Sequence, residues 1–278
     1  MNKKMIALAV AGAVALPGVV MAEEAAPPPP LTFNVGVVSD YLFRGISQTH
    51  GNPALQGGVD YAFSNGLYVG AWASNINWVK DFLGSGSTEI DVYGGYKGAI
   101  TEDLGYDVGY ITYNYPGKGS ASALLANPNT QEVYVGLSYK WLSAKYSHAT
   151  SSHFVGWYGG SALDQNTRGS NYLELNANYD MGDGWTLIGH VGHQKVKNSV
   201  SIPAIYDASY SDWKIGVSKD VGFGVIGLAY SDTNASGSCG NPFPAAGASS
   251  YCWGTDKSSQ NYKDVAKGVA LLSFTKTF

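Results

Sequence analysis

The chain has 278 residues, of which only 14% are charged, against roughly 25% in an ordinary soluble domain. It contains 36 glycines and 20 tyrosines, and its formal net charge is −4. This acidic balance argues against nucleic acid as a partner, because nucleic-acid binding calls for a basic surface. A low-charge chain rich in Gly and Tyr favours short alternating strands with aromatic side chains near their ends.

The N-terminal 22 residues have the pattern of a secretory signal peptide. Lys3 and Lys4 form a positive start, an apolar stretch follows, and Val20-Met21-Ala22 offers a small-residue cleavage site. Residues 23–31 include four consecutive prolines and are expected to form an extended periplasmic lead-in. No other stretch reaches the roughly 18 apolar residues of a transmembrane helix. An exported chain of this kind is soluble in the periplasm, secreted, or a barrel.

From residue 32 onward, about twelve segments alternate apolar and polar side chains, as strands with two different faces do. The clearest places Val133, Val135 and Leu137 opposite Glu132 and Ser138. The segment Leu67–Asn75 is ambiguous, because both of its faces carry apolar residues. The predicted strands are Thr32–Arg44, Ala54–Phe63, Leu67–Asn75, Thr88–Ile100, Gly105–Tyr115, Gln131–Leu142, Ser143–Thr150, Asn171–Tyr179, Trp185–Val196, Ser209–Lys219, Phe223–Ser231 and Gly268–Phe278.

The connections between these strands alternate in length. Those after even-numbered strands are short, such as Ser64–Gly66 and Leu142–Ser143, and those after odd-numbered strands are long, such as residues 151–170 and 232–267. An outer-membrane barrel sorts its connections in this way, with short periplasmic turns and long extracellular loops, whereas a soluble sandwich has no reason to. The sequence therefore predicts an all-β, antiparallel transmembrane β-barrel of about 12 strands over residues 32–278, in the outer membrane of a Gram-negative bacterium.

The last predicted strand fits this architecture. Its apolar face is expected to meet lipid, and it is expected to close the barrel by pairing with Thr32–Arg44. On this segment alone, the edge strand of a soluble sandwich is an equal alternative. Phe278 is expected to act as the assembly signal for the barrel-assembly machinery. Lys276 lies on the lipid side, where its amine can extend toward the membrane interface.

Aromatic residues gather near the predicted strand ends, where a membrane barrel carries aromatic girdles. Such girdles would mark the two membrane interfaces. The predicted girdle residues are Phe33, Phe43, Phe63, Tyr96, Trp141, Tyr179, Trp185, Tyr210, Phe223 and Phe278.

The two cysteines, Cys239 and Cys252, lie in one polar segment rich in Gly, Ser and Pro. In an oxidising compartment they are expected to form a disulfide. Closing a loop of that size removes about 3 kcal/mol of unfolded-state freedom. A metal pair or a reactive thiol is disfavoured, because no His or third Cys lies nearby in the sequence.

Several motifs give the chain a family resemblance that covers most of its length beyond the signal peptide. The sequence resembles the TorF-family porins, also called the Gcw_chp group of proteobacterial outer-membrane proteins. The resemblance implies a barrel of porin type, with no settled substrate and no catalytic residues to carry over. The cysteine-containing loop inherits no family role. The motifs are S39-D-Y-L-F-R-G-I-S-Q-T49, Q56-G-G-V-D-Y61, L67-Y-V-G-A-W-A-S-N75, E89-I-D-V-Y-G-G-Y96, G105-Y-D-V-G-Y-I-T-Y-N-Y115 and E132-V-Y-V-G-L-S-Y-K-W-L-S-A-K-Y-S147.

The polar face of the strands supplies the candidate pore-lining residues. Acids outnumber bases among them, which hints at a mild cation preference, although charges that pair across the lumen are the stronger alternative. Asp40 and Arg44, on one face of the first predicted strand, are candidates for such pairing. The acids are Asp40, Asp60, Glu89, Asp91, Asp107, Glu132, Glu174 and Asp212, and the bases are Arg44, Lys97, Lys140, Lys145 and Lys214.

No catalytic, metal or cofactor site is predicted. His190 and His193 are three residues apart, so in a strand they point to opposite faces and cannot chelate one ion together. No G-x-S-x-G, H-E-x-x-H or P-loop motif is present. The scattered Ser, His and Asp residues do not define a triad.

The predicted function is a porin-like channel, monomeric or trimeric, for passive diffusion of small hydrophilic solutes or ions. Its expected surroundings are outer-membrane lipid and the barrel-assembly machinery. Two alternatives stay open. One is a closed structural or adhesive barrel that acts through its extracellular loops, and the other is a barrel hydrolase.

Overall fold

The computed structural model describes residues 29–120, 126–157, 165–198, 208–235, 239, 250–254 and 262–278. The predicted signal peptide and most of the proline-rich lead-in lie outside these residues. Among the described residues, no helix combines the length and apolar character needed to cross a membrane.

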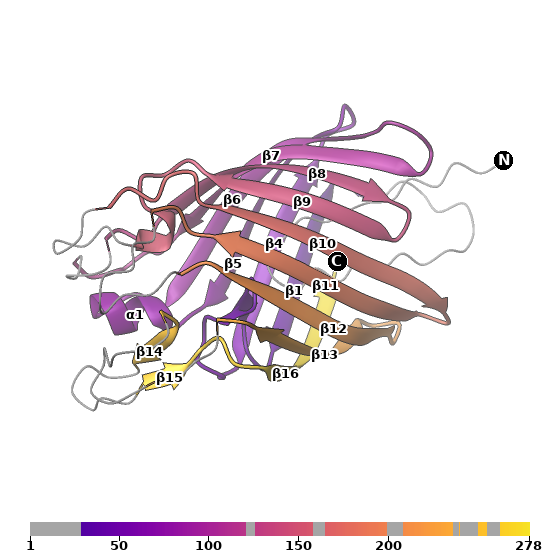
Figure 1. The fold of residues 1–278 in the computed structure, drawn as a ribbon. Helices are drawn as coiled ribbons and strands as arrows, with labels where there is room; N and C mark the ends of the chain where they lie inside the picture. The colour runs from indigo at the N-terminus through magenta and orange to yellow at the C-terminus, as the bar shows by residue number, and fades with distance from the viewer. Residues whose placement is uncertain are drawn as a thin grey trace.

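The described chain forms a closed antiparallel barrel of twelve strands (Figure 1). Each strand pairs with its neighbours along the chain, and β1 pairs with β16 to close the ring. The all-β, twelve-stranded antiparallel barrel predicted from the sequence is thus confirmed. The barrel strands are β1 (Leu31–Val38), β4 (Ala54–Ala62), β5 (Leu67–Asn75), β6 (Thr88–Ala99), β7 (Leu104–Asn114), β8 (Thr130–Tyr139), β9 (Leu142–Ala149), β10 (Asn171–Gly182), β11 (Trp185–Lys195), β12 (Tyr210–Asp220), β13 (Val225–Thr233) and β16 (Val269–Thr277).

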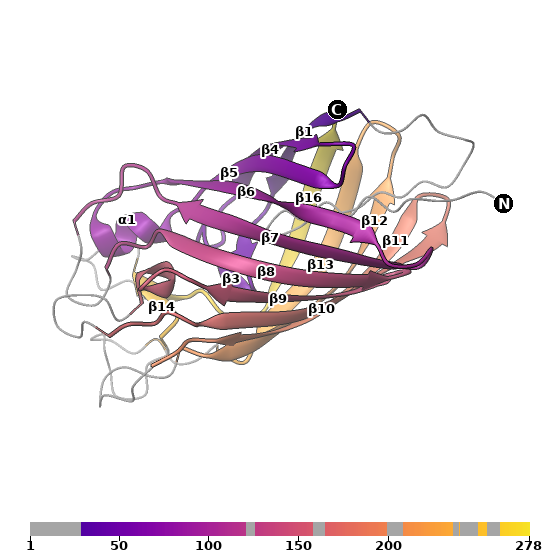
Figure 2. The ribbon, with the colours of Figure 1, turned by 90° about the horizontal axis from the view of Figure 1, so that it is seen from above.

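The two ends of the barrel differ in the length of their connections. At one end the strands are joined by turns of two to four residues, as between β8 and β9 or between β12 and β13. At the other end every connection is longer, and four of the connections carry small elements: β2 (Leu42–Phe43), β3 (Ile46–Ser47), α1 (Trp78–Leu83), η1 (Phe154–Gly156), β14 (Cys252–Gly254) and β15 (Tyr262–Asp264). Figure 2 shows the same division from above. We call the two ends the short-turn end and the long-loop end.

The outer surface of the barrel is apolar and its interior is polar. Outward side chains such as Leu55, Ile215 and Leu228 are more than half exposed, as lipid-facing residues of a barrel are when no lipid is present. In β5, which the sequence left ambiguous, Tyr68 and Trp72 point inward and are buried.

The predicted pairing of the first and last strands is confirmed, and it reaches Phe278. The backbone N–H of Phe278 donates to the carbonyl of Phe33 at 2.8 Å, and the reciprocal bond measures 3.2 Å. The Nζ of Lys276 lies 4.9 Å from the centre of the Phe278 ring. A cation–π contact with this ring therefore accompanies the outward lysine.

Three details of the sequence prediction are wrong. The first strand ends at Val38 instead of Arg44, because the chain turns into a separate small hairpin whose own alternation continues the pattern. The β8–β9 turn lies at Lys140 and Trp141 instead of Leu142–Ser143, with Lys140 at a positive φ of 53°. Phe43 and Tyr210 belong to no girdle, because Phe43 lies in that hairpin and Tyr210 is buried inside the barrel.

Candidate functional site

Residues 39–53, which connect β1 to β4, fold into the barrel, and we call them the inserted loop. At its tip, β2 and β3 form a hairpin with two residues between them, Arg44 and Gly45. Both have positive φ, 50° and 81°, which is the backbone geometry of a type I′ turn. The tight turn makes the loop narrow enough to enter the lumen.

Asp40 holds the two arms of the inserted loop together. Its Oδ1 accepts hydrogen bonds from Ser47 Oγ at 2.6 Å, Thr49 Oγ1 at 2.8 Å and the Gly51 backbone N–H at 3.2 Å. Burial raises the pKa of the Asp40 carboxyl, and these hydrogen bonds act in the opposite direction. Asp40 is therefore a buried support of the loop, not a strand residue that lines a pore.

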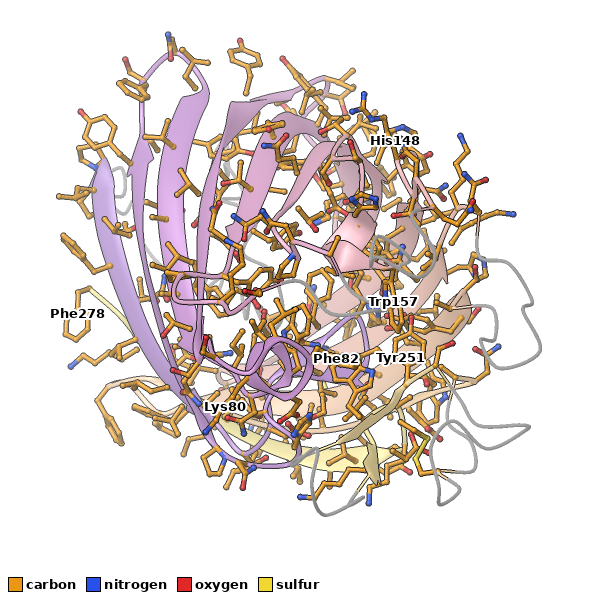
Figure 3. The ribbon with its side chains drawn as sticks, turned by 90° about the vertical axis from the view of Figure 1, so that its left-hand side faces the viewer. Lys80, Phe82, His148, Trp157, Tyr251 and Phe278 are labelled. Atoms are coloured by element: carbon orange, nitrogen blue, oxygen red, sulfur yellow. A yellow bond between two sulfur atoms is a disulfide. The ribbon has the colours of Figure 1, made fainter. Side chains whose placement is uncertain are left out.

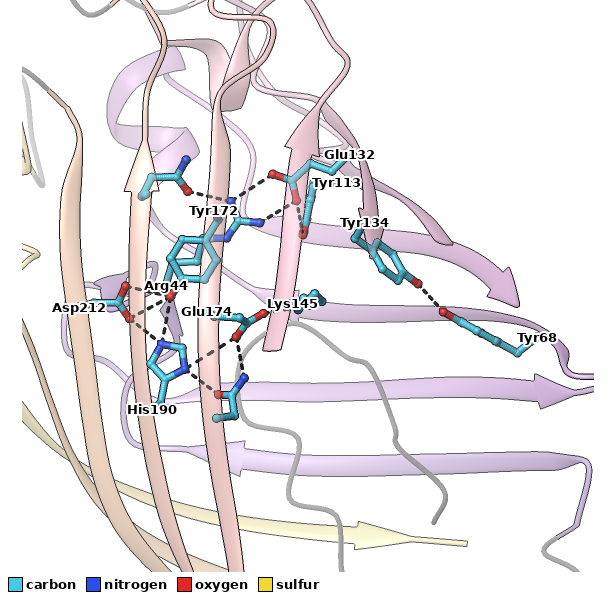
Figure 4. Close-up of polar contacts among 12 residues, drawn as sticks. Arg44, Tyr68, Tyr113, Glu132, Tyr134, Lys145, Tyr172, Glu174, His190 and Asp212 are labelled. Atoms are coloured by element: carbon cyan, nitrogen blue, oxygen red, sulfur yellow. Dashed lines mark hydrogen bonds and ion pairs between the residues drawn. The ribbon is translucent and has the colours of Figure 1, made fainter. Parts of the chain in front are cut away.

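The Arg44 side chain crosses the lumen to the opposite wall (Figure 4). Its Nη1 and Nη2 donate to the two carboxylate oxygens of Glu132 on β8, at 3.1 and 2.7 Å, and Nη1 also donates to Gln194 on β11 at 2.7 Å. β8 lies five strands away from β1 in the ring. A bidentate pair of this kind fixes both position and orientation, so the loop is tied across the barrel.

Aromatic rings enclose the Arg44 guanidinium. Its Cζ lies 4.4, 4.8 and 5.7 Å from the ring centres of Tyr172, Phe43 and Phe154. The side chains of Arg44 and Glu132 are only 8% and 0% exposed. Removing either partner of such a pair leaves an uncompensated charge out of contact with water.

Gly45 fits tightly against the barrel wall. A Cβ atom added at this position would lie 2.7 Å from Asp212 Cβ and 2.7 Å from Thr233 Cγ2. Neither contact is with the end of a flexible side chain, so any larger residue would push the hairpin away from β12 and β13. The backbone carbonyl of Arg44 also accepts a hydrogen bond from Tyr210 Oη at 2.9 Å.

The half of the lumen nearest the long loops contains more acids than bases among the predicted residues. Tyr41 Oη in the inserted loop donates to Glu89 at 2.8 Å. Asp91 is buried, and its Oδ1 has no hydrogen-bond partner within the described part of the chain. With Glu132, these acids face the single predicted base Arg44, which makes the inserted loop the source of positive charge here.

In the half of the lumen nearest the short turns, the predicted acids have lysine or tyrosine partners. Lys145 pairs with Glu174 at 3.2 Å, and their side chains stay 27% and 16% exposed. Tyrosines accompany the other acids, since Tyr93 donates to Asp60 at 2.6 Å and Tyr68 donates to Asp107 at 2.7 Å. Lys97 and Lys214 are the remaining inward bases, and Asp212, in register with Glu174 across β10, β11 and β12, is a further acid.

A hydrogen-bonded chain connects the two halves (Figure 4). His190 Nε2 lies 2.9 Å from Asp212 Oδ1, and His190 Nδ1 lies 2.7 Å from Asn176 Oδ1. Tyr172 Oη donates to Asp212 Oδ2 at 2.9 Å, while the Tyr172 ring faces Arg44. The wall that receives the inserted loop is thus itself held in place by polar contacts.

The structure places most of the predicted pore-lining residues on inward faces of strands, and three of them elsewhere. Asp40 and Arg44 lie in the inserted loop and do not pair with each other, because Arg44 pairs with Glu132. Lys140 lies in the β8–β9 turn, about half exposed and 3.7 Å from Asp103. The inward residues are Asp60, Glu89, Asp91, Lys97, Asp107, Glu132, Lys145, Glu174, Asp212 and Lys214.

The two histidines of β11 lie on opposite faces. His190 is inside the barrel, and His193 is exposed outside, with its Nδ1 2.9 Å from Ser211 Oγ. In the described parts of the chain, no three His, Cys, Asp or Glu residues are grouped as metal ligands.

Inward tyrosines are the functional residues that sequence reasoning missed. Tyr172 stacks on Arg44, Tyr113 donates to Glu132 at 3.3 Å, and the hydroxyls of Tyr68 and Tyr134 lie 2.5 Å apart. The alternation that selected the charged residues also puts these tyrosines on the inward face. If the alternation had been applied to tyrosines as well as to charged residues, these tyrosines would have been predicted to face the lumen.

An aromatic layer covers the long-loop end of the lumen (Figure 3). The ring of Trp253 lies 5.8 Å from Trp78, 5.6 Å from Phe82 and 6.1 Å from Tyr251. A disulfide between Cys239 and Cys252, as predicted, fixes the residue next to Trp253. We call the layer formed by α1, β14 and β15 the cap.

A buried polar pair joins the inserted loop to the cap. His50 Nε2 of the inserted loop lies 3.1 Å from Asp81 Oδ2 of α1. Burial lowers the pKa of His50 to about 4, with Lys263 acting in the same direction. Burial raises the pKa of Asp81 to about 7. Both shifts favour the uncharged forms.

Comparison with known proteins adds a family. The family described as "Bacterial protein of unknown function (Gcw_chp)" matches residues 22–253. The chain belongs to the Gcw_chp family. The first of the motifs that carry the family resemblance, residues 39–49, lies within the inserted loop. A search of curated proteins gave no match.

Among solved structures, the chain is similar to several porins. A KdgM porin in complex with disordered oligogalacturonate is 7% identical, with a TM-score of 0.49 over 89% of this chain and 98% of that one. The NanC porin is 10% identical, with a TM-score of 0.45 over 89% and 97%. Pseudomonas aeruginosa OprD is 10% identical, with a TM-score of 0.37 over 90% and 66%. Because these TM-scores lie below 0.5, the role of this chain is inferred from its own residues.

Proposed function

We propose that the chain is a porin-like channel of the outer membrane, through which small hydrophilic solutes or ions diffuse, and that the inserted loop forms its constriction. The observation that carries the proposal is a charged, tyrosine-rich lumen inside a closed barrel with an apolar outer surface. A barrel needs no charged interior to be stable. Lys145 and Glu174 keep part of their side chains exposed, and charges in contact with water cost little, whereas unpaired charges in a packed core would be buried at high cost.

The proposed orientation places the short turns in the periplasm and the long loops outside the cell, in a Gram-negative bacterium. It rests on the sorting of connection lengths and on the predicted signal peptide. Phe278 is proposed as the signal for the barrel-assembly machinery. Deleting it should reduce membrane insertion far more than it alters the conductance of the protein that does insert.

The distribution of charge suggests how ions would be selected. Near the long loops, Glu89, Asp91 and Glu132 face the single predicted base Arg44, whereas nearer the short turns Lys145 pairs with Glu174. With the inserted loop in place, weak ion selectivity is expected. With the loop withdrawn, the uncompensated acids should favour cations.

Planar-bilayer recording tests this proposal. Purified protein should give discrete conductance steps that increase with salt concentration, and the reversal potential in a salt gradient should lie close to zero. A silent bilayer at high protein load would count against a channel.

A second candidate function is a closed barrel that acts through its long loops. The observation that favours it is the enclosed Arg44–Glu132 pair, which joins opposite walls of the lumen with almost no exposed surface. In that case, shortening the long loops would abolish surface binding and leave solute uptake unchanged.

A hydrolase finds less support. The polar contacts described for His190 are with Tyr172, Glu174, Asn176 and Asp212, and none of these is a serine or cysteine nucleophile. A Ser–His–acid arrangement needs a nucleophile within hydrogen-bond reach of the histidine. Ser211 Oγ lies 2.9 Å from His193 Nδ1, but this pair is exposed on the outer face of the barrel. Assays on lipid and peptide substrates would test this alternative, with His190→Gln as the variant.

A further inference from the structure

A basic groove lies on the outer surface of the barrel, at the long-loop end of β9, β10 and β11. His148, Asn171 and Lys195 stand in register across these three neighbouring strands, on the outward face. Arg168 and Lys197, just beyond the ends of β10 and β11, line the same groove, which has a volume of about 670 Å³. Four basic side chains thus converge on one outward position. Figure 3 shows His148 at this rim.

Gly169 allows two of these side chains to approach each other. It has a φ of 87°, and a Cβ atom added to it would lie 3.5 Å from Lys197 Nζ and 3.6 Å from His148 Cε1. Because Gly169 has no side chain, the Lys197 amine and the His148 ring can both lie close to its backbone. The side-chain amides of Asn171 and Asn198 are bonded to backbone carbonyls beside them, which fixes part of the wall.

Among the described residues, no acid neutralises the positive charge of the groove. None of the described residues that line it is acidic, and in the same part of the chain Arg168, Lys195 and Lys197 make no ion pair. The only side-chain partner found for the Arg168 guanidinium in that part of the chain is Ser152 Oγ, at 3.4 Å. A cluster of this sign in a chain of net charge −4 has the character of an anion site.

The groove lies immediately beyond the apolar belt. Two residues further from the rim, Tyr146 and Leu173 are exposed on the same outward face, followed by Leu175 and Val191. Residues two apart on a strand are about 7 Å apart. In the proposed orientation the groove is therefore at the depth of the headgroups of the outer leaflet.

We propose that this groove binds the phosphate groups of an anionic lipid in the outer leaflet. The inference rests on the proposed placement in the outer membrane. Arginine and lysine are the side chains that bind phosphate best, and basic pockets at the membrane surface hold anionic headgroups. The neighbouring apolar belt gives the acyl chains of the same lipid a surface to contact, which a free phosphate ion would not use.

The test measures binding of bis-phosphorylated lipid A, dephosphorylated lipid A and inorganic phosphate to the full-length purified protein in detergent. The variant is Arg168→Gln/Lys195→Gln/Lys197→Gln. Its matched control is Lys140→Gln/Lys219→Gln/Lys276→Gln, which removes the same charge at the short-turn end. Circular dichroism and bilayer conductance show whether each variant has folded as the native barrel does.

Native protein and control are expected to bind phosphorylated lipid A alike, and the groove variant on the order of tenfold or more weaker. Dephosphorylated lipid A should bind weakly to all three proteins. An equal loss of lipid A binding in both variants would show that binding depends only on the net charge of the protein, and would overturn the proposal. Displacement of the lipid by millimolar inorganic phosphate would assign the groove to a free anion and also overturn it.

Binding measurements on the native protein alone also test the inference, without any variant. Equal binding of the phosphorylated and dephosphorylated lipids by native protein would contradict the inference even if the variants fail to fold. Protein that conducts but does not prefer the phosphorylated lipid would refute the groove and leave the channel standing. Protein that binds the lipid but does not conduct would do the reverse.

Discussion

Each half of the lumen contains an ion pair, but the two pairs differ in how far they are exposed to solvent. In the long-loop half, Arg44 and Glu132 are almost fully enclosed, with aromatic rings stacked on the guanidinium. In the short-turn half, Lys145 and Glu174 form a comparable pair that stays partly open to water. The difference arises because the inserted loop and its surrounding aromatic rings enclose the first pair and not the second.

This contrast shows that an inward charge on a barrel strand has no fixed role. Where water is present, the charge costs little and is free to act on a passing ion. Where a loop excludes water, the same type of charge must be paired, and the pair then fastens the loop. The position of the inserted loop therefore decides which charges are structural and which line a pathway.

The largest expected effect comes from breaking the enclosed pair. Arg44→Met should lower the free energy of unfolding by about 3–5 kcal/mol, because Glu132 is left buried without a partner. It should also raise conductance by releasing the loop. The control is Lys145→Met, whose partly exposed pair should cost about 1 kcal/mol or less. Urea unfolding in detergent measures both, and equal losses would remove the distinction between the halves.

Loss of the disulfide should act on the cap rather than on the lumen. The double variant Cys239→Ser/Cys252→Ser should lower stability by about 3 kcal/mol in the chain-entropy estimate. Hydrogen exchange should rise in β14, β15 and α1, which pack around Trp253, while the barrel strands stay protected. Faster exchange throughout β8–β11 would contradict this separation.

A smaller effect is expected from the fit of the hairpin tip. Gly45→Ala should cost about 1–3 kcal/mol and increase conductance, because its methyl group would meet Asp212 and Thr233. Gly51→Ala is the matched control, with a similar positive φ of 76° and nothing within 4 Å of the added atom. The control should show only the backbone cost of about 1 kcal/mol. Unchanged conductance in Gly45→Ala, with the protein folded, would contradict the role of the tip.

The smallest effect concerns pH and the pair of His50 and Asp81. Between pH 4 and 6.5 the unfolded pair holds one proton on His50, and the folded pair holds one proton on Asp81. The pair therefore contributes almost no pH dependence to stability. In Asp81→Asn only the lowered pKa of His50 remains, so stability should rise with pH across this window. In His50→Gln only the raised pKa of Asp81 remains, so stability should fall from about pH 4 to about pH 7.

Thermal unfolding midpoints at several pH values measure these slopes. Opposite signs in the two single variants are the expected result. Slopes of the same sign would contradict a folded state in which His50 is neutral and Asp81 is protonated.

The barrel itself was predictable from the sequence, because alternation and loop sorting are local signals. Strand faces follow from a period of two, so Glu132, Glu174 and Asp212 could be placed inside before any coordinates were known. The alternation of short and long connections along the chain then predicted which end of the barrel carries the long loops.

The inserted loop was not predictable for a physical reason. Alternation runs from β1 through the hairpin, so the segment resembles one long strand. Whether a loop folds inward depends on partners far away in the sequence: Glu132 lies 88 residues from Arg44, and Gln194 lies 150 residues from it. No local pattern contains that information.

The most direct test replaces the hairpin. The Tyr41 carbonyl accepts a hydrogen bond from the Gln48 N–H at 2.7 Å, so two glycines can join these residues in place of Leu42–Ser47 without stretching the loop. Single-channel recording in planar bilayers should show larger conductance steps and a cation-selective reversal potential for this variant than for the native protein. Identical steps and reversal potentials, with both proteins folded, would contradict the inserted loop as the constriction of a channel.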